Sequence, residues 1–408
     1  MKRRIVLVGD YNRSDFLYVA SLLHTEVEFY FIEFINEHFF KNKECLKFGH
    51  VIYWKNFSNA YDLINKIRPD TIIFYFIESY NHVALNVAAR AIGIPTIHLE
   101  HGLRFKSESL FKESNHWERS VNRLKKLSHV DHLYDRYAGR MFFWKTIKKS
   151  EQREKEFLDL YYSVRKRNSI QSTFEKIRNP LRLADRYISF SPLIFDYHKK
   201  TEGLPDDYPV CYVGIPFFDH FAKWRSLEMA GKNILFIDQP LYEQKILGWT
   251  IDYKKEFVTK LCRVTQALDK KLYIKPHPWN EKSGYEGVSG DVIMAGDEWE
   301  QIIPDINVVL GFSSTLLMPF MAMDHITCFT LEMHPEKADI NYSDFLLQSK
   351  ACEPVYNFEE LKTKLIDLES CHLQQKKHKA HFIENWMYKF DGNSSQRLRK
   401  VLLKNEAV

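Results

Sequence analysis

The chain has few of the features that mark a secreted, membrane-spanning or nucleic-acid-binding protein. It has only six cysteines in 408 residues and no CxxC pair, so neither a disulfide scaffold nor a paired-cysteine site is indicated. No stretch is apolar over the roughly 18 residues that a membrane-spanning helix needs. The 58 basic and 53 acidic side chains give a net charge of +5, which is too small to indicate a nucleic-acid partner. We therefore expect a cytoplasmic protein in a reducing compartment.

The N-terminal residues also lack the pattern of a signal peptide. Positive charges precede only a short apolar run, residues 5–8, which Gly9 and Asp10 end, so we expect a buried first strand there. Basic side chains are frequent between residues 122 and 157. A solvated helix face is the simpler interpretation, and peripheral contact with an anionic membrane surface is the alternative.

The composition is that of a folded globular protein, with 45% hydrophobic and 27% charged residues, and the length predicts two domains. Short apolar runs alternate with helical patterns, which predicts parallel strands and an α/β fold. The runs in the first half are residues 5–8, 27–35, 70–76 and 96–99. Those in the second half begin near Tyr187 and continue at residues 210–213, 233–237, 272–274, 292–294, 308–310 and 326–331.

We therefore expect two Rossmann-like, doubly wound domains that face an interdomain cleft. The N-terminal domain is predicted to span residues 1–185, with a helical elaboration near 117–180, and the C-terminal domain residues 186–385. A last helix within 386–408 is expected to pack back on the N-terminal domain. Ligands of such sheets bind beyond the carboxyl ends of the strands, so the candidate residues are expected there.

The first candidate is the segment Lys275-Pro276-His277-Pro278, which ends an apolar strand. Each proline fixes its own φ and favours an extended residue before it, so His277 is held with little freedom. Its imidazole can donate to a phosphate oxygen, and Lys275 adds a positive charge. The alternative is a surface turn with a structural histidine.

The second candidate is Gly311 with the hydroxyl run Ser313-Ser314-Thr315, between a buried strand and a helical stretch, residues 316–323. Glycine permits close backbone approach, and a helix N-terminus offers free N–H groups, so the pattern predicts a phosphate cradle. The alternative is an ordinary helix cap, which needs only one hydroxyl.

The third candidate lies in the first half, where Glu100, His101, Gly102 and Arg104 follow the strand at residues 96–99. Glu100 and His101 are both credible general bases for removing a hydroxyl proton. Neighbouring residues on a strand point to opposite faces, so only one of them is expected to face substrate. We assign Gly9, Asp10, Gly102 and Arg104 to the acceptor side or the cleft.

These motifs resemble those of the GT-B glycosyltransferases of bacterial surface polysaccharides, particularly the sialyltransferase, polysialyltransferase and Kdo-transferase types. The HP motif and the Ser/Thr motif of those enzymes are matched by His277-Pro278 and Ser313-Ser314-Thr315. The acidic residue that often stands near a glycine as their base is matched by Glu100-His101-Gly102, although the middle position is histidine here. The resemblance implies a nucleotide-sugar donor bound by the C-terminal half.

Two related families share parts of the pattern. The tail from Phe390 to Arg397, with Asp391-Gly392, is similar to the C-terminal DG-x-x-x-x-R segment of CDP-glycerol polymerases, whose His-Gly loop would match His101-Gly102. The segment from His98 to Arg104 resembles the HxEAGLR loop of UDP-GlcNAc 2-epimerases. His101 stands where that loop has alanine, and Ser313-Ser314-Thr315 replaces the later SGG loop of the epimerases. Both departures favour transfer over epimerisation.

The resulting hypothesis is an enzyme that moves a sugar from a CMP- or UDP-linked donor, with CMP favoured, to a glycan or lipid-linked glycan acceptor in capsule or surface glycan synthesis. It needs no further cofactor, and the sequence shows no DxD-like cluster, so metal-independent transfer is expected. The competing hypotheses are an epimerase, a CDP-glycerol-type glycerophosphotransferase and a non-catalytic nucleotide-binding scaffold. Partners other than substrates would be the inner face of the cell membrane or other polysaccharide-synthesis proteins.

Overall fold

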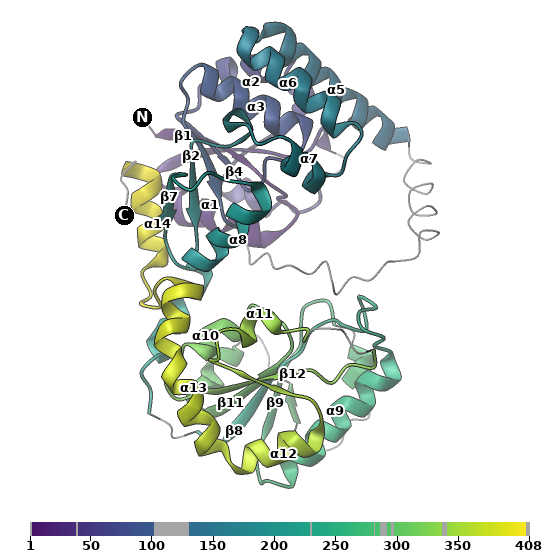
Figure 1. The fold of residues 1–408 in the computed structure, drawn as a ribbon, viewed down its shortest axis with the longest axis vertical. Coiled ribbons are helices and arrows are strands. Elements are labelled where there is room, and N and C mark those ends of the chain that lie inside the picture. The colour runs from purple at the N-terminus through teal and green to yellow at the C-terminus, as the bar shows by residue number, and fades with distance from the viewer. Residues whose placement is uncertain are drawn as a thin grey trace. The chain divides into compact units, whose positions relative to one another are not determined.

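The computed structural model describes residues 2–37, 40–101, 130–228, 231–280, 282–285, 292–294, 298–336 and 341–404. The chain divides into two compact units, each built on its own parallel sheet (Figure 1). Of the described residues, unit 1 holds those up to 101, residues 130–217 and residues 394–404. Unit 2 holds those between 218 and 393. The backbone therefore passes from unit 1 into unit 2 and later returns.

Unit 1 contains a seven-stranded parallel sheet in the order β3-β2-β1-β4-β5-β6-β7. Its strands are β1 (Arg3–Val8), β2 (Val27–Ile32), β3 (Gly49–Ile52), β4 (Thr71–Phe74), β5 (Thr96–Leu99), β6 (Arg186–Ser189) and β7 (Val210–Tyr212). The side chains of Ile5, Val6, Leu7 and Val8 are all fully buried. Alternate residues of a strand point to opposite faces, so both faces of this sheet are covered, as in other parallel sheets.

Helices connect the strands of unit 1 and form its helical elaboration. The connecting helices are α1 (Tyr18–Leu23), α2 (Ala60–Ile67), α3 (Tyr80–Ala91) and α8 (Pro192–Glu202). The elaboration comprises α5 (Val130–Lys149), α6 (Gln152–Arg165) and α7 (Ile170–Lys176). Side-chain caps fix the N-termini of several helices. The Asn59 side chain accepts from the backbone N–H of Asp62 at the start of α2, and the Ser79 side chain accepts from that of His82 at the start of α3.

Unit 2 contains a six-stranded parallel sheet in the order β10-β9-β8-β11-β12-β13. Its strands are β8 (Asn233–Ile237), β9 (Leu272–Lys275), β10 (Val292–Met294), β11 (Ile306–Gly311), β12 (Thr327–Leu331) and β13 (Glu353–Val355). Its helices are α9 (Ile251–Gln266), α10 (Leu317–Met321), α11 (Asp344–Leu347), α12 (Phe358–Ile366) and α13 (Leu368–Phe382). The α/β class and the two Rossmann-like sheets agree with the sequence-based expectation.

The domain boundary expected between residues 185 and 186 is wrong. β6 pairs with β5, and β7 pairs with β6, so both strands extend the first sheet and the units divide after Phe217. Alternation of strands and helices does not reveal which sheet a strand joins. Here the free edge of β5 accepts β6, with Ile97 opposite Arg186 and Leu99 opposite Ile188.

The last helix, α14 (Ser394–Lys404), belongs to unit 1 and packs near its first strand. The Arg3 guanidinium donates to the carbonyl oxygens of Leu402 and Leu403 at 2.8 and 3.0 Å. The buried Arg397 donates through Nε to the carbonyl oxygen of Val213 at 2.9 Å. No helix in the described part of the chain is both long and apolar enough to cross a membrane.

Candidate active site

Three neighbouring strands of unit 2 end in one row. The register of the parallel sheet places Lys275 of β9 opposite Ile237 of β8, and Ile237 opposite Gly311 of β11. His277 follows Lys275 by two residues, and Ser313 follows Gly311 by two. The sheet therefore brings the His277 and Ser313 loops to the same edge, on either side of the end of β8, where ligands of open α/β sheets bind.

His277 is half-buried in a turn that fixes its hydrogen-bonding state. Its Nδ1 accepts from the backbone N–H of Trp279 at 3.2 Å, and its carbonyl oxygen accepts from the backbone N–H of Asn280 at 2.9 Å. Burial lowers the pKa of His277, and the positive charge of Lys275 lowers it further. A neutral imidazole that accepts at Nδ1 carries its hydrogen on Nε2. The turn thus presents Nε2–H as a donor, while Pro278 and Trp279 are exposed.

The hydroxyl loop follows β11 directly. Ser313 and Ser314 are half-buried and Thr315 is exposed. Ser314 Oγ accepts from the backbone N–H of Leu316 at 3.3 Å, just before α10. A Cβ on Gly311 would lie 3.0 Å from Leu317 Cδ2, so a larger residue there would make the Leu317 side chain shift by a few tenths of an ångström. Gly311 therefore packs closely against Leu317, and the hydroxyls of the loop are the groups available for a ligand.

The end of β8 carries two polar residues outside the three predicted motifs, Asp238 and Gln239. Asp238 is almost fully buried, and its Oδ2 accepts from Asn280 Nδ2 at 2.7 Å and from the Tyr285 hydroxyl at 2.5 Å. Lys254 Nζ lies 3.3 Å from the same oxygen. Burial raises the pKa of Asp238, and Lys254 and the hydrogen bonds oppose this rise. The signal for both residues in the sequence is their position directly after a predicted buried strand.

In unit 1 the structure separates the two candidate bases. Glu100 is fully buried, with Oε2 accepting from the Tyr187 hydroxyl at 3.1 Å and lying 2.9 Å from His198 Nε2. His198 is in turn 3.9 Å from Glu202, which pairs with the buried Arg182. The carboxylate of Glu100 therefore lies inside a buried polar network.

His101, the next residue, is half-buried in an aromatic setting. Its ring stacks on Phe16 with a centroid distance of 5.0 Å and meets the edges of Tyr75 and Phe76 at 5.9 and 5.6 Å. Phe76 also lines a hollow of about 640 Å³, to which Asp10 contributes. Phe76 thus contacts both the imidazole of His101 and the hollow that contains Asp10, although His101 is not one of the residues that line this hollow.

The remaining candidates of unit 1 are Gly9, Gly102 and Arg104. A Cβ on Gly9 would lie 2.5 Å from Tyr75 Cδ2, so this glycine is required by packing against an aromatic ring. Gly102 and Arg104 lie outside the described residues, as do residues 117–129 of the expected helical elaboration. Their place on the acceptor side stays a prediction.

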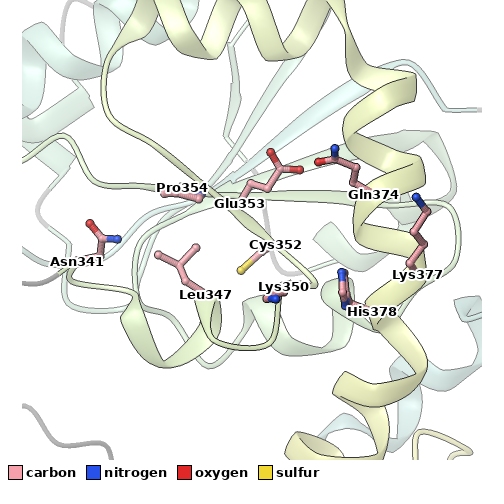
Figure 2. A pocket seen from close by; sticks show the side chains of 9 residues that line it. All are labelled: Asn341, Leu347, Lys350, Cys352, Glu353, Pro354, Gln374, Lys377 and His378. Atoms are coloured by element: carbon pink, nitrogen blue, oxygen red, sulfur yellow. The ribbon is translucent and has the colours of Figure 1, made fainter.

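A separate hollow of about 530 Å³ lies beside β13 in unit 2 (Figure 2). Its lining includes Lys350 and Cys352 just before the strand, Glu353 at its start, and Lys377 with His378 from α13. Lys364 pairs with Glu353 at 2.8 Å. None of the candidate residues within the described ranges lines this hollow, which is therefore distinct from the row of strand ends.

The described side chains offer no preformed metal centre. Within those ranges no cluster of three or more His, Cys, Asp or Glu residues is arranged to hold a metal ion. The strand ends of unit 2 instead combine a lysine, an imidazole and three hydroxyls, which suit an anionic ligand.

Residues 6–332 match a family model described as alpha-2,8-polysialyltransferase (POLYST). Among curated proteins, none matches the chain in sequence. The matched range includes all three candidate motifs. It ends before α11, so the model covers most of the second sheet and stops short of the C-terminal helices.

Solved glycosyltransferase structures share the fold at low sequence identity. The wall teichoic acid polymerase TagF aligns with a TM-score of 0.50 and 11% identity, over 99% of this chain and 89% of that one. MurG of Acinetobacter baumannii aligns with a TM-score of 0.50 and 10% identity over 100% of both chains. UGT89C1 of Arabidopsis thaliana gives 0.50 and 10%, over 99% of both. These likenesses establish a GT-B fold of two Rossmann-like domains.

Proposed function

Since this chain is a glycosyltransferase of the alpha-2,8-polysialyltransferase family, we propose that it transfers sialic acid from a CMP-linked donor to a glycan acceptor in capsule or surface polysaccharide synthesis. The family membership supports the reaction class. The choice of CMP follows from the family description, because sialic acid is activated as its CMP conjugate. A lipid-linked glycan acceptor is included in the proposal.

The observation that carries the donor side is the row of strand ends in unit 2. Lys275, Ile237 and Gly311 stand in register, so the His277 turn and the Ser313-Ser314-Thr315 loop share one sheet edge. A phosphate there would accept from the Nε2–H of His277 and from serine hydroxyls. Such donors are preorganised for the negative charge that grows on the nucleotide as the bond from the sugar to the phosphate oxygen breaks.

The acceptor side is assigned to unit 1, with His101 rather than Glu100 as the general base. The Glu100 carboxylate is fully buried and engaged by Tyr187 and His198. His101 is half-buried and contacts Phe76, which lines the hollow containing Asp10. A base must reach the hydroxyl proton that it removes, and accessibility favours the imidazole. In this proposal Glu100 orients Tyr187 and His198, and His101 takes the acceptor proton.

The proposal describes a metal-independent transfer. The acceptor hydroxyl oxygen attacks the anomeric carbon, the bond to the CMP phosphate oxygen breaks, and the acceptor proton passes to His101. The negative charge on the departing CMP is met by Lys275, His277 and the serine hydroxyls. A peripheral position on the inner face of the cell membrane belongs to the same proposal, because surface glycans are built on membrane-linked acceptors.

The donor assignment is tested by thermal shift with CMP, CDP, UDP and GDP. A ligand that binds only the folded state stabilises it by RT ln(1 + [L]/Kd), so the selective nucleotide gives the largest rise in Tm. We expect CMP to be that nucleotide and the His277→Ala variant to lose most of the rise. A shift by UDP alone would refute the CMP assignment, and a shift by CDP alone would favour glycerophosphotransfer.

Epimerisation differs from transfer in its substrate requirement. Transfer needs an acceptor, whereas an epimerase converts UDP-GlcNAc alone. Incubation of the enzyme with CMP-sialic acid and an oligosialic acceptor should release CMP and lengthen the acceptor. Conversion of UDP-GlcNAc without an acceptor would support epimerisation, and activity that survives loss of both His101 and His277 would contradict the assigned roles.

A further inference from the structure

Asp238 and Gln239 are adjacent in sequence, yet their side chains bind two different loops. We propose that they are positioning residues for the donor: Asp238 holds the His277 turn through Asn280, and Gln239 holds the Ser313-Ser314-Thr315 loop. The inference rests on the proposed function, in which both loops bind the same nucleotide phosphate. It adds that a single dipeptide at the end of β8 sets the relation between these loops.

The first arm is the bond from Asn280 to Asp238. Asn280 Nδ2 donates to Asp238 Oδ2 at 2.7 Å, while the backbone N–H of Asn280 donates to the carbonyl oxygen of His277 at 2.9 Å. Asn280 is therefore bound to the turn through its backbone and to Asp238, directly after β8, through its side chain. The Tyr285 hydroxyl donates to the same carboxylate oxygen at 2.5 Å and accepts from Asn280 Nδ2 at 2.6 Å.

The second arm is the bond from Gln239 to the hydroxyl loop. Gln239 Nε2 donates to the carbonyl oxygen of Ser313 at 2.8 Å. The backbone N–H of Gln239 donates to Asp238 Oδ1 at 2.8 Å, so the two oxygens of one carboxylate serve the two arms. A shift of Asp238 would consequently move both loops.

The chemistry of this cluster indicates a role beyond fold stability. Asp238 and Lys254 are nearly fully buried, and Lys254 Nζ also lies 2.9 Å from Glu243. Taking such ions out of water is costly, and apolar side chains of similar volume often stabilise a fold as well or better. The cluster lies at the end of the central strand between the two candidate loops, where precise orientation is needed.

Leucine substitutions test the arms, because leucine keeps much of the volume of glutamine or asparagine and removes the hydrogen bonds. We would measure the affinity of the full chain for CMP in Gln239→Leu and Asn280→Leu, each alone and combined with Ser314→Ala or His277→Ala. Each single leucine variant should weaken CMP binding about tenfold. Gln266→Leu, at the exposed end of α9, is the matched control and should bind CMP as the wild type does.

The combinations separate positioning from a general loss of stability. If Gln239 acts through the hydroxyl loop, Gln239→Leu should lose most of its effect in the Ser314→Ala background and keep it in the His277→Ala background. Asn280→Leu should show the reverse pattern. If the leucine variants do not fold, Gln239→Ser and Asn280→Ser carry the same comparison.

Two results would overturn the inference. Effects that are equal in both backgrounds, or that follow the fall in Tm of each variant, would show that the residues only stabilise unit 2. If the wild type binds CMP but the leucine substitutions have the same effect in both backgrounds, the positioning role is removed and the proposed function still stands. Failure of the wild type to bind any of CMP, CDP, UDP or GDP would overturn the proposed function, and the inference with it.

Discussion

His198 Nε2 lies 2.9 Å from Glu100 Oε2, and both side chains are almost completely buried in unit 1. This contact gives Glu100 surroundings that differ from those of His101, the other candidate base. Glu100 faces the interior, where it is held by His198 and Tyr187, and His101 faces the aromatic group of Phe16, Tyr75 and Phe76. Sequence pattern alone does not distinguish these two environments.

The first prediction follows from this division. Glu100→Ala leaves His198 and the Tyr187 hydroxyl without their buried partner, so it should lower the free energy of unfolding by about 1–3 kcal/mol. His101→Ala should lower kcat at least about a hundredfold, with a smaller fall in Tm than Glu100→Ala causes. Thermal unfolding and steady-state kinetics of both variants check this.

The conservative variant Glu100→Gln is the control for the roles in unit 1. It keeps the shape of the side chain and an oxygen for the Tyr187 hydroxyl. Loss of turnover in Glu100→Gln at an unchanged Tm, together with an active His101→Ala enzyme, would make Glu100 the base.

A second prediction concerns pH. Burial, followed by the charge of Lys275, lowers the pKa of His277, and burial also lowers the pKa values of His325 and His372. The unfolded chain therefore binds more protons than the folded one as the pH falls through about 6.5. The free energy of unfolding should decrease on acidification through this range, and denaturant titrations at several pH values measure it.

The same shift can be followed at one residue. Replacing Lys275 by methionine removes a positive charge beside His277, so the pKa of His277 should rise towards its ordinary value while burial keeps it from reaching that value. An NMR titration of the imidazole gives the result, with Lys362→Met on α12 as the control. An unchanged pKa in Lys275→Met would contradict the cause assigned here.

A third prediction concerns Gly9. The Cβ of an alanine would lie 2.5 Å from Tyr75 Cδ2 and 3.1 Å from Phe16 Cδ1, and the Tyr75 hydroxyl is bonded to the Phe16 carbonyl oxygen at 2.8 Å. The ring cannot move away without breaking that bond, so Gly9→Ala should cost about 1–3 kcal/mol of stability.

Gly139 provides the matched control for this substitution. The atoms nearest to its Cβ would be those of the Asn81 side chain, the first at 3.4 Å, and Gly139 lies within α5. Alanine there should be neutral or stabilise by up to about 1 kcal/mol through helix propensity. Equal Tm values for Gly9→Ala and the wild type would refute the packing account of Gly9.

A fourth prediction tests the attachment of α14. Arg397→Ala removes the bond to the Val213 carbonyl oxygen and a buried side chain, so α14 should detach more often and become open to proteolysis. Arg399→Ala, which removes an exposed ion pair with Glu26, should change cleavage little. Equal cleavage rates for the two variants would contradict a special role of Arg397.

Hydrophobic patterning predicted most of the strands well. The run at 233–237 coincides with β8, the run at 96–99 with β5, and that at 292–294 with β10. β3 and β13, which are both edge strands, were missed. β3 is only partly buried, and β13 contains Pro354, so neither shows a continuous apolar run.

The site residues could be predicted where a local motif marks them. They were less predictable where contacts between residues distant in the sequence bring them together. The position of His277 and Ser313 at strand ends could be read directly. Their common edge depended on β8 lying between β9 and β11, which is a property of strand order. The network from Glu100 to His198 joins residues about a hundred positions apart, and no local sequence pattern indicates it.

The path of the chain through the two units also sets the order in which their parts are synthesised. Unit 2 is one continuous segment of the described chain after Phe217, whereas unit 1 includes α14, which follows it. A ribosome therefore finishes every described strand of both sheets before it delivers the helix that Arg3 and Val213 bind. Translation that stops before α14 would release unit 2 attached to a first unit that still lacks this helix, so a nascent chain needs α14 for a fully assembled unit 1.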